Sequence, residues 1–136
     1  MREVTVSRFV GATRPAVERA LDPATILEAE GTFSVVDTDD TDEGTVVTAR
    51  TTGMEAVFVF SEREDGYQYH QRGESGPFST METTLTLASE DEGTRVTMTS
   101  DVSLGLPLTA LTDRVAGWKR RGELERALDT LTEDVA

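Results

Sequence analysis

The stretch TRVTMTSDVSLGLPLTALTDRVAGWKRRGELERALDTLTEDV, residues 94–135, decides the fold. Residues 94–102 alternate apolar and polar side chains, which is typical of a strand with one buried face. After residues 105–107 (Gly-Leu-Pro), the apolar residues recur mostly at steps of three, four and seven. This change of period predicts a strand followed by an amphipathic helix of about seven turns over residues 108–133.

Six more strands are predicted before this stretch, and short turns join most of them. We expect them at residues 2–10, 32–38, 45–52, 54–62, 67–73 and 78–89. Two of the turns, residues 63–66 (REDG) and 90–93 (EDEG), end in glycine, as hairpin turns often do. Because short turns connect antiparallel neighbours, the pattern predicts a seven-stranded antiparallel sheet.

Two short helices are predicted between the first and second strands. Thr13 and Asp22 are residues that cap helices, and a proline follows each of them in the first turn, at Pro15 and Pro23. The expected fold class is therefore α+β, with a curved antiparallel sheet gripping a long C-terminal helix. We expect residues 1–136 to form one domain.

This order of strand, two short helices, six strands and long helix resembles the START/Bet v 1-like superfamily, also called SRPBCC or polyketide cyclase/dehydrase-like. The opening RFVGATRPAVERALDP (residues 8–23) resembles that family's first strand, small-residue turn and proline-started helix. The ending WKRRGELERALDTL (residues 118–131) resembles its final helix. The family's usual tryptophan in the first helix is absent, and Glu18-Arg19 stands near that place. The resemblance covers essentially the whole chain.

The resemblance implies a helix-grip fold, in which the long helix crosses the concave face of the sheet. Members of the family use the cavity between helix and sheet for lipids, hormones, polyketides or other apolar molecules, and some are enzymes. For this chain it implies binding of a small apolar or amphipathic ligand, lipid- or polyketide-like, without catalysis. The chain is shorter than the lipid-carrying START proteins, which implies a smaller cavity.

Methionine and aromatic side chains are the best candidates for lining such a cavity, since they adapt to irregular apolar ligands. The candidate cavity-lining residues are Met54, Phe58, Phe60, Tyr67, Tyr69, Met81, Met98, Leu111, Val115 and Trp118. The alternative is that they form an ordinary filled core. Leu111, Val115 and Trp118 are spaced by four and three residues, which predicts that the indole of Trp118 faces the sheet near Tyr67 or Tyr69 and Phe58 or Phe60.

The sequence offers no convincing catalytic set. His70 is the only histidine, and alternation places it with Gln68 and Arg72 on a polar face that we expect to meet solvent. Glu55 and Glu82 interrupt apolar strands and are also expected on the convex face. The chain has no cysteine, which removes thiol catalysis and thiolate metal sites. No catalytic residue, metal site or cofactor is predicted.

Two other functions stay open. One is a cyclase- or dehydratase-like enzyme acting on a cavity-bound ketone, with Tyr67, Tyr69, His70 or Arg72 facing inward. The other is an interaction protein whose groove meets a partner or another copy of the chain, so a homodimer is possible. Inward-facing polar groups favour the enzyme, whereas a filled cavity with an exposed apolar patch favours the interaction protein.

Charge composition adds an environmental prediction. The chain has 26 acidic and 13 basic residues, a formal net charge of -13, and Lys119 is its only lysine. An acidic, lysine-poor and threonine-rich composition resembles that of salt-in halophiles of the haloarchaeal type. Molar salt shortens the Debye length to about 3 Å and so screens repulsion among the carboxylates. The alternative is an ordinary acidic protein.

The same composition narrows the expected partners and location. Nucleic acid is an unfavourable partner because a strongly acidic chain repels phosphate. No apolar run approaches the roughly 20 residues of a membrane span, and Met1-Arg2-Glu3-Val4 lacks the apolar core of a signal peptide. We therefore expect a cytoplasmic protein.

Overall fold

The computed structural model describes residues 2–73, 78–103 and 109–135; of residues 109–113 and 134, only the backbone is described. The elements in chain order are β1 (Arg2–Val10), α1 (Arg14–Arg19), α2 (Pro23–Ala29), β2 (Ser34–Thr41), β3 (Gly44–Thr51), β4 (Met54–Arg63), β5 (Gly66–Gln71), β6 (Thr80–Glu90), β7 (Gly93–Ser103) and α3 (Thr109–Val135). The predicted elements are confirmed, with boundaries that move by only a few residues.

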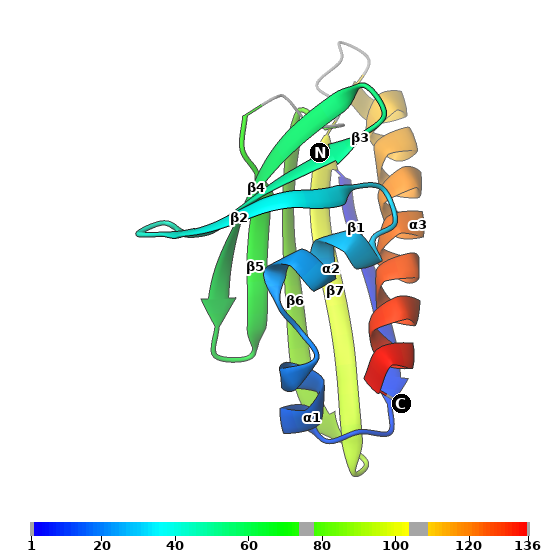
Figure 1. Ribbon diagram of the computed structural model, residues 1–136. Helices are drawn as coiled ribbons and strands as arrows, with labels where there is room; N and C mark the ends of the chain where they lie inside the picture. Colours follow the sequence, from blue (N-terminus) through cyan, green and yellow to red (C-terminus); the bar gives the residue numbers. More distant parts are fainter. Residues whose placement is uncertain (1, 74–77, 104–108, 136) are drawn as a thin grey trace.

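The strands form one sheet in the order β1-β7-β6-β5-β4-β3-β2, and every neighbouring pair is antiparallel. The sheet curves, and all three helices lie on its concave side (Figure 1). Helix α3 packs chiefly against β1, β7 and α2, so it runs along one side of the sheet. The predicted helix-grip α+β fold is therefore confirmed.

Both short helices begin at the predicted caps. The hydroxyl of Thr13 accepts a hydrogen bond from the backbone N–H of Ala16 at 3.4 Å, and the carboxylate of Asp22 accepts one from Thr25 at 2.9 Å. A proline lies in the first turn of each helix, where its missing N–H leaves no bond unmade. These caps let α1 and α2 stay short while they cover the concave face.

Two hairpin turns use backbone conformations with positive φ. At Gly66 φ is 150°, and a Cβ there would lie 1.9 Å from the carbonyl oxygen of Leu85, so only glycine fits. Between β6 and β7, Asp91 and Glu92 both have positive φ, at 47° and 65°, although neither is glycine. The second turn therefore holds two side chains in a conformation that L residues rarely adopt.

The buried stripe of α3 differs from the predicted one. Leu124, Leu128 and Leu131 are buried, but Val115 is 51% exposed and Trp118 is 79% exposed. Trp118 and Leu124 are six residues apart, which at about 100° per residue turns them about 120° away from each other. Val115 and Leu124, nine residues apart, lie on opposite sides of the helix. The prediction that Val115 and Trp118 face the sheet is wrong.

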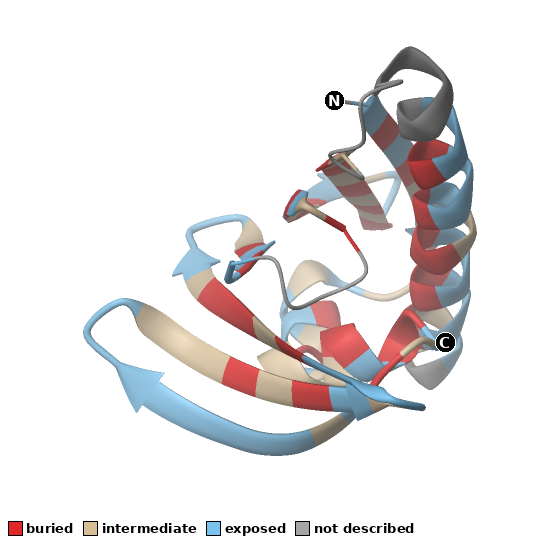
Figure 2. Cartoon of the chain, turned by 90° about the horizontal axis from the view of Figure 1, so that it is seen from above, coloured by how far each residue is buried: buried red, intermediate tan, exposed pale blue. Residues whose placement is uncertain are grey.

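Ala116, Gly117 and Arg120 continue the buried stripe toward the helix N-terminus, as the red bands along the inner side of α3 show (Figure 2). Gly117 is needed there because a Cβ would lie 2.5 Å from Cγ of Arg2 and 3.5 Å from a methyl group of Val4. Its missing side chain lets α3 approach β1 closely.

Within the described part of the chain, none of the helices combines the length and the apolar character that crossing a bilayer requires.

Candidate ligand-binding site

The concave face carries the aromatic and methionine side chains that the sequence pattern brought together. Phe58 and Phe60 of β4, Tyr69 of β5, Met81 of β6 and Met98 of β7 all point to this side and are at most 3% exposed. They belong to one continuous apolar cluster that includes residues of α2 and α3. These five residues thus lie on the concave face, as the alternation of side chains along the strands predicted.

Aromatic contacts fix part of this face. The rings of Phe60 and Tyr69 stack with centroids 4.3 Å apart, and Phe33 meets Phe58 edge-on at 5.7 Å. Phe33 precedes β2, so this contact ties the far edge of the sheet to its centre. The aromatic rings thus form part of the buried core between the sheet and the helices.

A buried cluster of polar side chains lies beside this apolar core, centred on Arg120 of α3. Its guanidinium bonds the carboxylate of Glu30, which follows α2, at two points: Nη1–Oε1 is 2.6 Å and Nη2–Oε2 is 3.0 Å. Nη2 also donates to Thr83 of β6 at 2.7 Å and to the phenol oxygen of Tyr69 at 3.3 Å. Nε donates to the hydroxyl of Ser100 of β7 at 3.0 Å.

The second carboxylate of the cluster is Glu123, one turn along α3. Arg120 Nη1 donates to it at 3.2 Å, and Lys119 Nζ lies 3.4 Å from its other oxygen. The hydroxyl of Thr32 also donates to Glu123. Two cations thus face two carboxylates, and α2, α3 and three strands are linked through one set of hydrogen bonds.

Burial and charge together set the proton affinities in this cluster. Burial alone would lower the pKa of Arg120, but the adjacent Glu30 carboxylate outweighs it, so the pKa stays above its ordinary range. Burial, and next the negative charge of Glu30, raises the pKa of Tyr69 well above its ordinary value of 10.0. At neutral pH, Arg120 is therefore charged. Tyr69 is a neutral phenol that keeps its proton and donates a hydrogen bond to Glu30.

The cluster is saturated. All the N–H groups of the Arg120 guanidinium face acceptors, and no buried side-chain nitrogen or oxygen in the described part of the chain lacks a hydrogen-bond partner. A base that accepts protons from a substrate needs a free lone pair facing it. In this arrangement the cluster holds helices to the sheet and places a polar group within an apolar core.

Several hollows open at the rim of the fold. One of about 450 Å³ lies where β5 ends and β6 begins, and is lined in part by His70, Gln71, Met81 and Glu82. Met81 lines this hollow and also has its sulfur 3.6 Å from Nη2 of Arg120, so it contacts both the hollow and the polar cluster. The size falls within the range of small-molecule sites.

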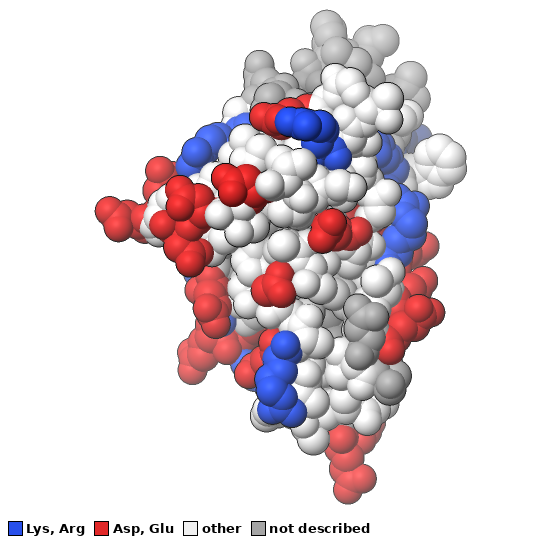
Figure 3. All heavy atoms as spheres, in the orientation of Figure 1, with Lys and Arg blue, Asp and Glu red and all other residues white. Residues whose placement is uncertain are grey.

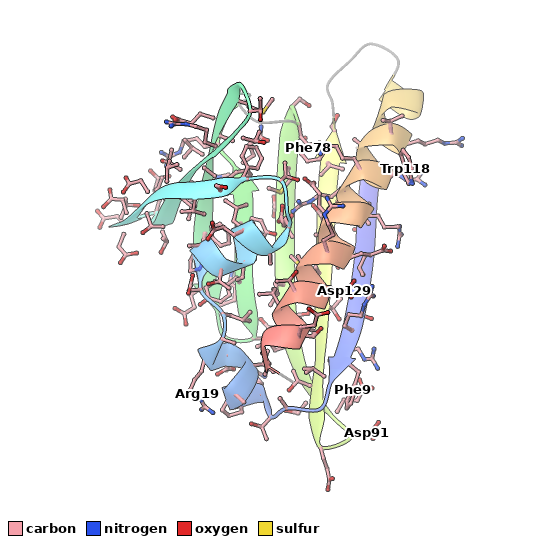
Figure 4. All side chains as sticks on the ribbon, turned by 45° about the vertical axis from the view of Figure 1, so that its right-hand side comes forward. Phe9, Arg19, Phe78, Asp91, Trp118 and Asp129 are labelled. Atoms are coloured by element: carbon pink, nitrogen blue, oxygen red, sulfur yellow. The ribbon has the colours of Figure 1, made fainter. Side chains whose placement is uncertain are left out.

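The other predicted lining residues lie elsewhere. Met54 is 36% exposed at the turn between β3 and β4, and Tyr67 is half-buried beside a hollow of about 110 Å³ near α1. Val115 and Trp118 lie on the outer side of α3, as Figure 4 shows for Trp118. The side chain of Leu111 is outside the described residues.

The four side chains that the sequence placed on the convex face, His70, Arg72, Glu55 and Glu82, face outward as predicted, whereas Tyr69 faces inward. His70 and Glu82 are exposed cross-strand neighbours on the convex face. Arg72 is exposed 3.3 Å from Glu43, and Glu55 pairs with Arg50 at 2.9 Å. Among the described residues, no three histidine or carboxylate side chains come together in a way that could hold a metal ion.

Sequence reasoning missed the buried charges. The sequence analysis assigned no role to Arg120, Glu123 or Glu30. A signal existed, because Arg120 precedes Leu124 and Leu131 by four and eleven residues and so shares their face. Glu123 follows Arg120 by three residues. Glu30, in contrast, lies beyond the end of a seven-residue helix, where periodicity gives little information.

Comparisons with known proteins identify the fold. No protein-family description matches the chain, and no curated protein matches its sequence. Among solved structures, TTHA0849 from Thermus thermophilus matches with a TM-score of 0.76 at 20% identity, covering 98% of this chain and 97% of that one. A START superfamily protein from Mycobacterium smegmatis matches with a TM-score of 0.66 at 14% identity, over 98% and 99% of the two chains.

A third match is the di-domain ARO/CYC protein BexL from the BE-7585A biosynthetic pathway. Its TM-score is 0.65 at 20% identity, with 98% of this chain and 47% of BexL covered. At these identities the likeness concerns the fold alone. The chain has the START/Bet v 1-like fold.

Proposed function

We propose that this chain binds a small amphipathic molecule, lipid- or polyketide-like, between the concave face of the sheet and α3, and that it does so without catalysis. The ligand's apolar body lies against Phe58, Phe60, Met81 and Met98. Its polar end meets the hydroxyl and guanidinium groups around Arg120. The fold it shares with START and ARO/CYC proteins supports this placement.

One observation carries the proposal: Arg120 bridges α3 to strands on which the helix does not mainly pack. Helix α3 lies against β1, β7 and α2, whereas the Arg120 side chain reaches Tyr69 of β5 and Thr83 of β6. Long side chains, rather than close helix-to-sheet packing, thus fill the space over the central strands. Rotation of such side chains opens room for a ligand at a smaller cost than moving the helix.

The two methionines give the site its adaptability. Met81 and Met98 are unbranched and have three rotatable bonds, so they can repack around a guest of irregular shape. Met81 lines the 450 Å³ rim hollow and also contacts Arg120 of the polar cluster. We therefore expect Met81 to move when a molecule passes from the rim to the interior.

Two measurements test the proposal. Native mass spectrometry of purified protein should reveal a co-purified molecule at one per chain. Titration with 8-anilinonaphthalene-1-sulfonate, an amphipathic fluorescent probe, should saturate at one site. Met98→Ala should strengthen probe binding by enlarging the interior, whereas Val36→Ala, an exposed change on β2, should leave it unaltered. Absence of both co-purified ligand and saturable probe binding would overturn the proposal.

An enzyme of the cyclase or dehydratase kind is the second candidate, because Tyr69 and Arg120 are polar groups that face inward. A neutral tyrosine beside a guanidinium can donate hydrogen bonds to a ketone oxygen and so polarise it. Release of Tyr69 and Arg120 from Glu30 would have to come first. Turnover of a poly-β-ketone model substrate that is lost in Tyr69→Phe, with ligand affinity retained, would favour this candidate over simple binding.

We also propose that the chain functions in the cytoplasm of a salt-in halophile. Its acidic side chains gather on the surface, notably on the side of the β2–β3 hairpin, where Asp37, Asp39, Asp40 and Glu43 are exposed (Figure 3). Such a surface suits molar salt, where its self-repulsion is screened. The dependence of stability on salt tests this setting.

A further inference from the structure

The outer face of α3 carries a strip of residues that begins with two exposed apolar side chains, Val115 and Trp118, and ends with two carboxylates. Val115, Trp118, Gly122, Glu125 and Asp129 follow one another at steps of three or four residues, and so lie on one side of the helix, opposite the buried stripe. We call these five residues the outer strip. Trp118 is 79% exposed, the largest exposed fraction among the exposed large apolar side chains described.

No contact within the described part of the chain requires glycine at position 122. A Cβ at this position would have only Nη1 of Arg126 within 4 Å, at 3.5 Å, which is ordinary contact. Gly117, in contrast, is required by the contact with β1. Glycine inside a helix lowers helix stability relative to alanine. Because glycine has no side chain, a glycine on the outer strip lets another backbone or a large side chain approach α3 closely. A hollow of about 490 Å³ lies over this point, between Trp118 and Arg126.

The exposed charges differ between the two halves of the helix, since the described first half bears only cations and the second half bears Glu125, Arg126 and Asp129. Arg114 and Arg121 flank Trp118 and, among the described residues, form no ion pair with a carboxylate. Glu125, in the second half, likewise has no ion-pair partner there, and Asp129 has only an exposed pair with Arg8. Arg114 and Arg121, without an ion pair among the described residues and next to an exposed tryptophan, are thus open to carboxylates of another molecule.

We propose that the outer strip is the interface of a homodimer, in which the α3 helices of two copies pack antiparallel and cross at Gly122. Antiparallel packing places the arginine-bearing half of each helix against the carboxylate-bearing half of the other. Trp118 of one copy then enters the space between Gly122, Glu125 and Asp129 of the second copy. The twofold axis makes every contact occur twice, as in other closed dimers.

A second copy fits this surface better than the other possible occupants. The outer strip and the arginines that flank it complement each other, since Arg114 and Arg121 of one copy face the end bearing Glu125 and Asp129 of the other when one helix is reversed. An anionic membrane would attract Arg114 and Arg121, but it would repel Glu125, Asp129 and a chain with a net charge of -13. Molar salt also strengthens apolar burial, so an exposed tryptophan is least favourable in the proposed setting.

The oligomeric state of the full chain is the first test. Sedimentation equilibrium over a concentration series should give twice the 14.8 kDa chain mass. Trp118→Ala should raise the dimer dissociation constant at least about tenfold, as loss of a central aromatic anchor does. Val115→Ala should raise it less. Val36→Ala is the matched control, because Val36 is 50% exposed but lies on β2, and it should change nothing. Circular dichroism verifies that each variant stays folded.

Charge reversal tests whether the contact is between two copies. Arg121→Glu and Glu125→Arg should each dissociate the dimer when studied alone at about 0.2 M KCl, where the Debye length is about 7 Å. In the homodimer of either variant, residues 121 and 125 carry like charges that face each other across the interface. An equimolar mixture of the two variants should dimerise again, because every cross-interface pair is then complementary. Neither residue belongs to the buried cluster around Arg120.

Cysteine cross-linking fixes the direction of the helices, since the chain has no natural cysteine. Val115→Cys should cross-link to Asp129→Cys in a mixture and not to itself. Self-cross-linking of Val115→Cys would mean parallel helices and would overturn the proposal.

Three further results would also overturn the proposal. They are a monomeric wild type at millimolar concentration, a dimer that is insensitive to Trp118→Ala, and failure of the charge-reversed mixture to dimerise. A chain that is monomeric in solution but binds anionic vesicles through Trp118 would show a membrane occupant instead.

Discussion

Arg120 and Glu30 form a two-point ion pair in the interior, with Nη1–Oε1 at 2.6 Å and Nη2–Oε2 at 3.0 Å. Their side chains are only 1% and 4% exposed. The pair joins α3 to the end of α2, and the same guanidinium reaches three strands. A charge pair so deeply buried is stable only while each partner satisfies the other.

Removing one partner should therefore be severe. Glu30→Ala leaves the Arg120 charge without its main counterion, and we expect the free energy of unfolding to fall by about 3–5 kcal/mol. Glu55→Ala is the control, because Glu55 belongs to an exposed pair with Arg50 and should cost less than about 1 kcal/mol. Urea unfolding in high salt measures both. Equal effects would show that the buried pair has no special role.

Tyr69 gives a pH prediction with a definite sign. Its pKa in the folded state is raised above 10.0 by burial and by Glu30, so the folded state holds its phenol proton more tightly than the unfolded state does. This contribution to stability is complete below pH 10 and is lost as the pH rises above 10 toward the folded pKa.

Tyr69→Phe should accordingly flatten the fall of unfolding free energy above pH 10, while lowering stability at pH 7 by about 1.5–3 kcal/mol through the lost bond to a charged acceptor. Tyr67→Phe should flatten it less, because burial raises the pKa of the half-buried Tyr67 by a smaller amount. An alkaline profile of Tyr69→Phe identical to that of wild type would contradict the assignment.

The sequence predicted backbone and strand faces better than helix phase. Alternation of period two placed Phe58, Phe60 and Met98 on the concave face because strand side chains have only two directions. On α3, a step of six between Trp118 and Leu124 was read as part of one stripe, although it turns the face by about 120°. The burial of Arg120 was not predicted, because it depends on partners from other elements, such as Glu30 and Thr83, that lie far away in the sequence.

Salt dependence follows from a row of acids on the convex face. Glu82 lies opposite Asp101, which in turn lies opposite Glu3, and directly opposed like charges destabilise a sheet. Glu82→Gln should raise the unfolding free energy by about 0.5 kcal/mol in dilute buffer and by almost nothing in molar KCl.

Thermal melts of wild type and Glu82→Gln at both salt levels measure this difference. The wild-type melting temperature should itself rise steeply with KCl. Glu55→Gln, which removes a favourable pair, should not raise stability in dilute buffer. A wild-type melting temperature that is independent of salt would contradict halophilic adaptation.

The turn between β6 and β7 offers a stabilising change. Glu92 has φ of 65°, a conformation that glycine adopts freely and glutamate does not. Glu92→Gly should raise the unfolding free energy by about 1 kcal/mol. Glu64→Gly is the control, since Glu64 lies in the β4–β5 turn and is not among the described residues with positive φ. It should leave stability unchanged or lower it. A larger gain in unfolding free energy from Glu64→Gly than from Glu92→Gly would contradict this interpretation of the turn.

The central claim is that ligands bind between the sheet and α3, and the methionines report on it directly. Met81 and Met98 lie on the buried concave face, whereas Met54 lies at the exposed β3–β4 turn. In protein labelled with ¹³C at the methionine methyl groups, titration with decanoate, a simple amphipathic probe, should shift the signals of Met81 and Met98 saturably and leave that of Met54 in place. Shifts confined to Met54, or no saturable shift at all, would contradict the account.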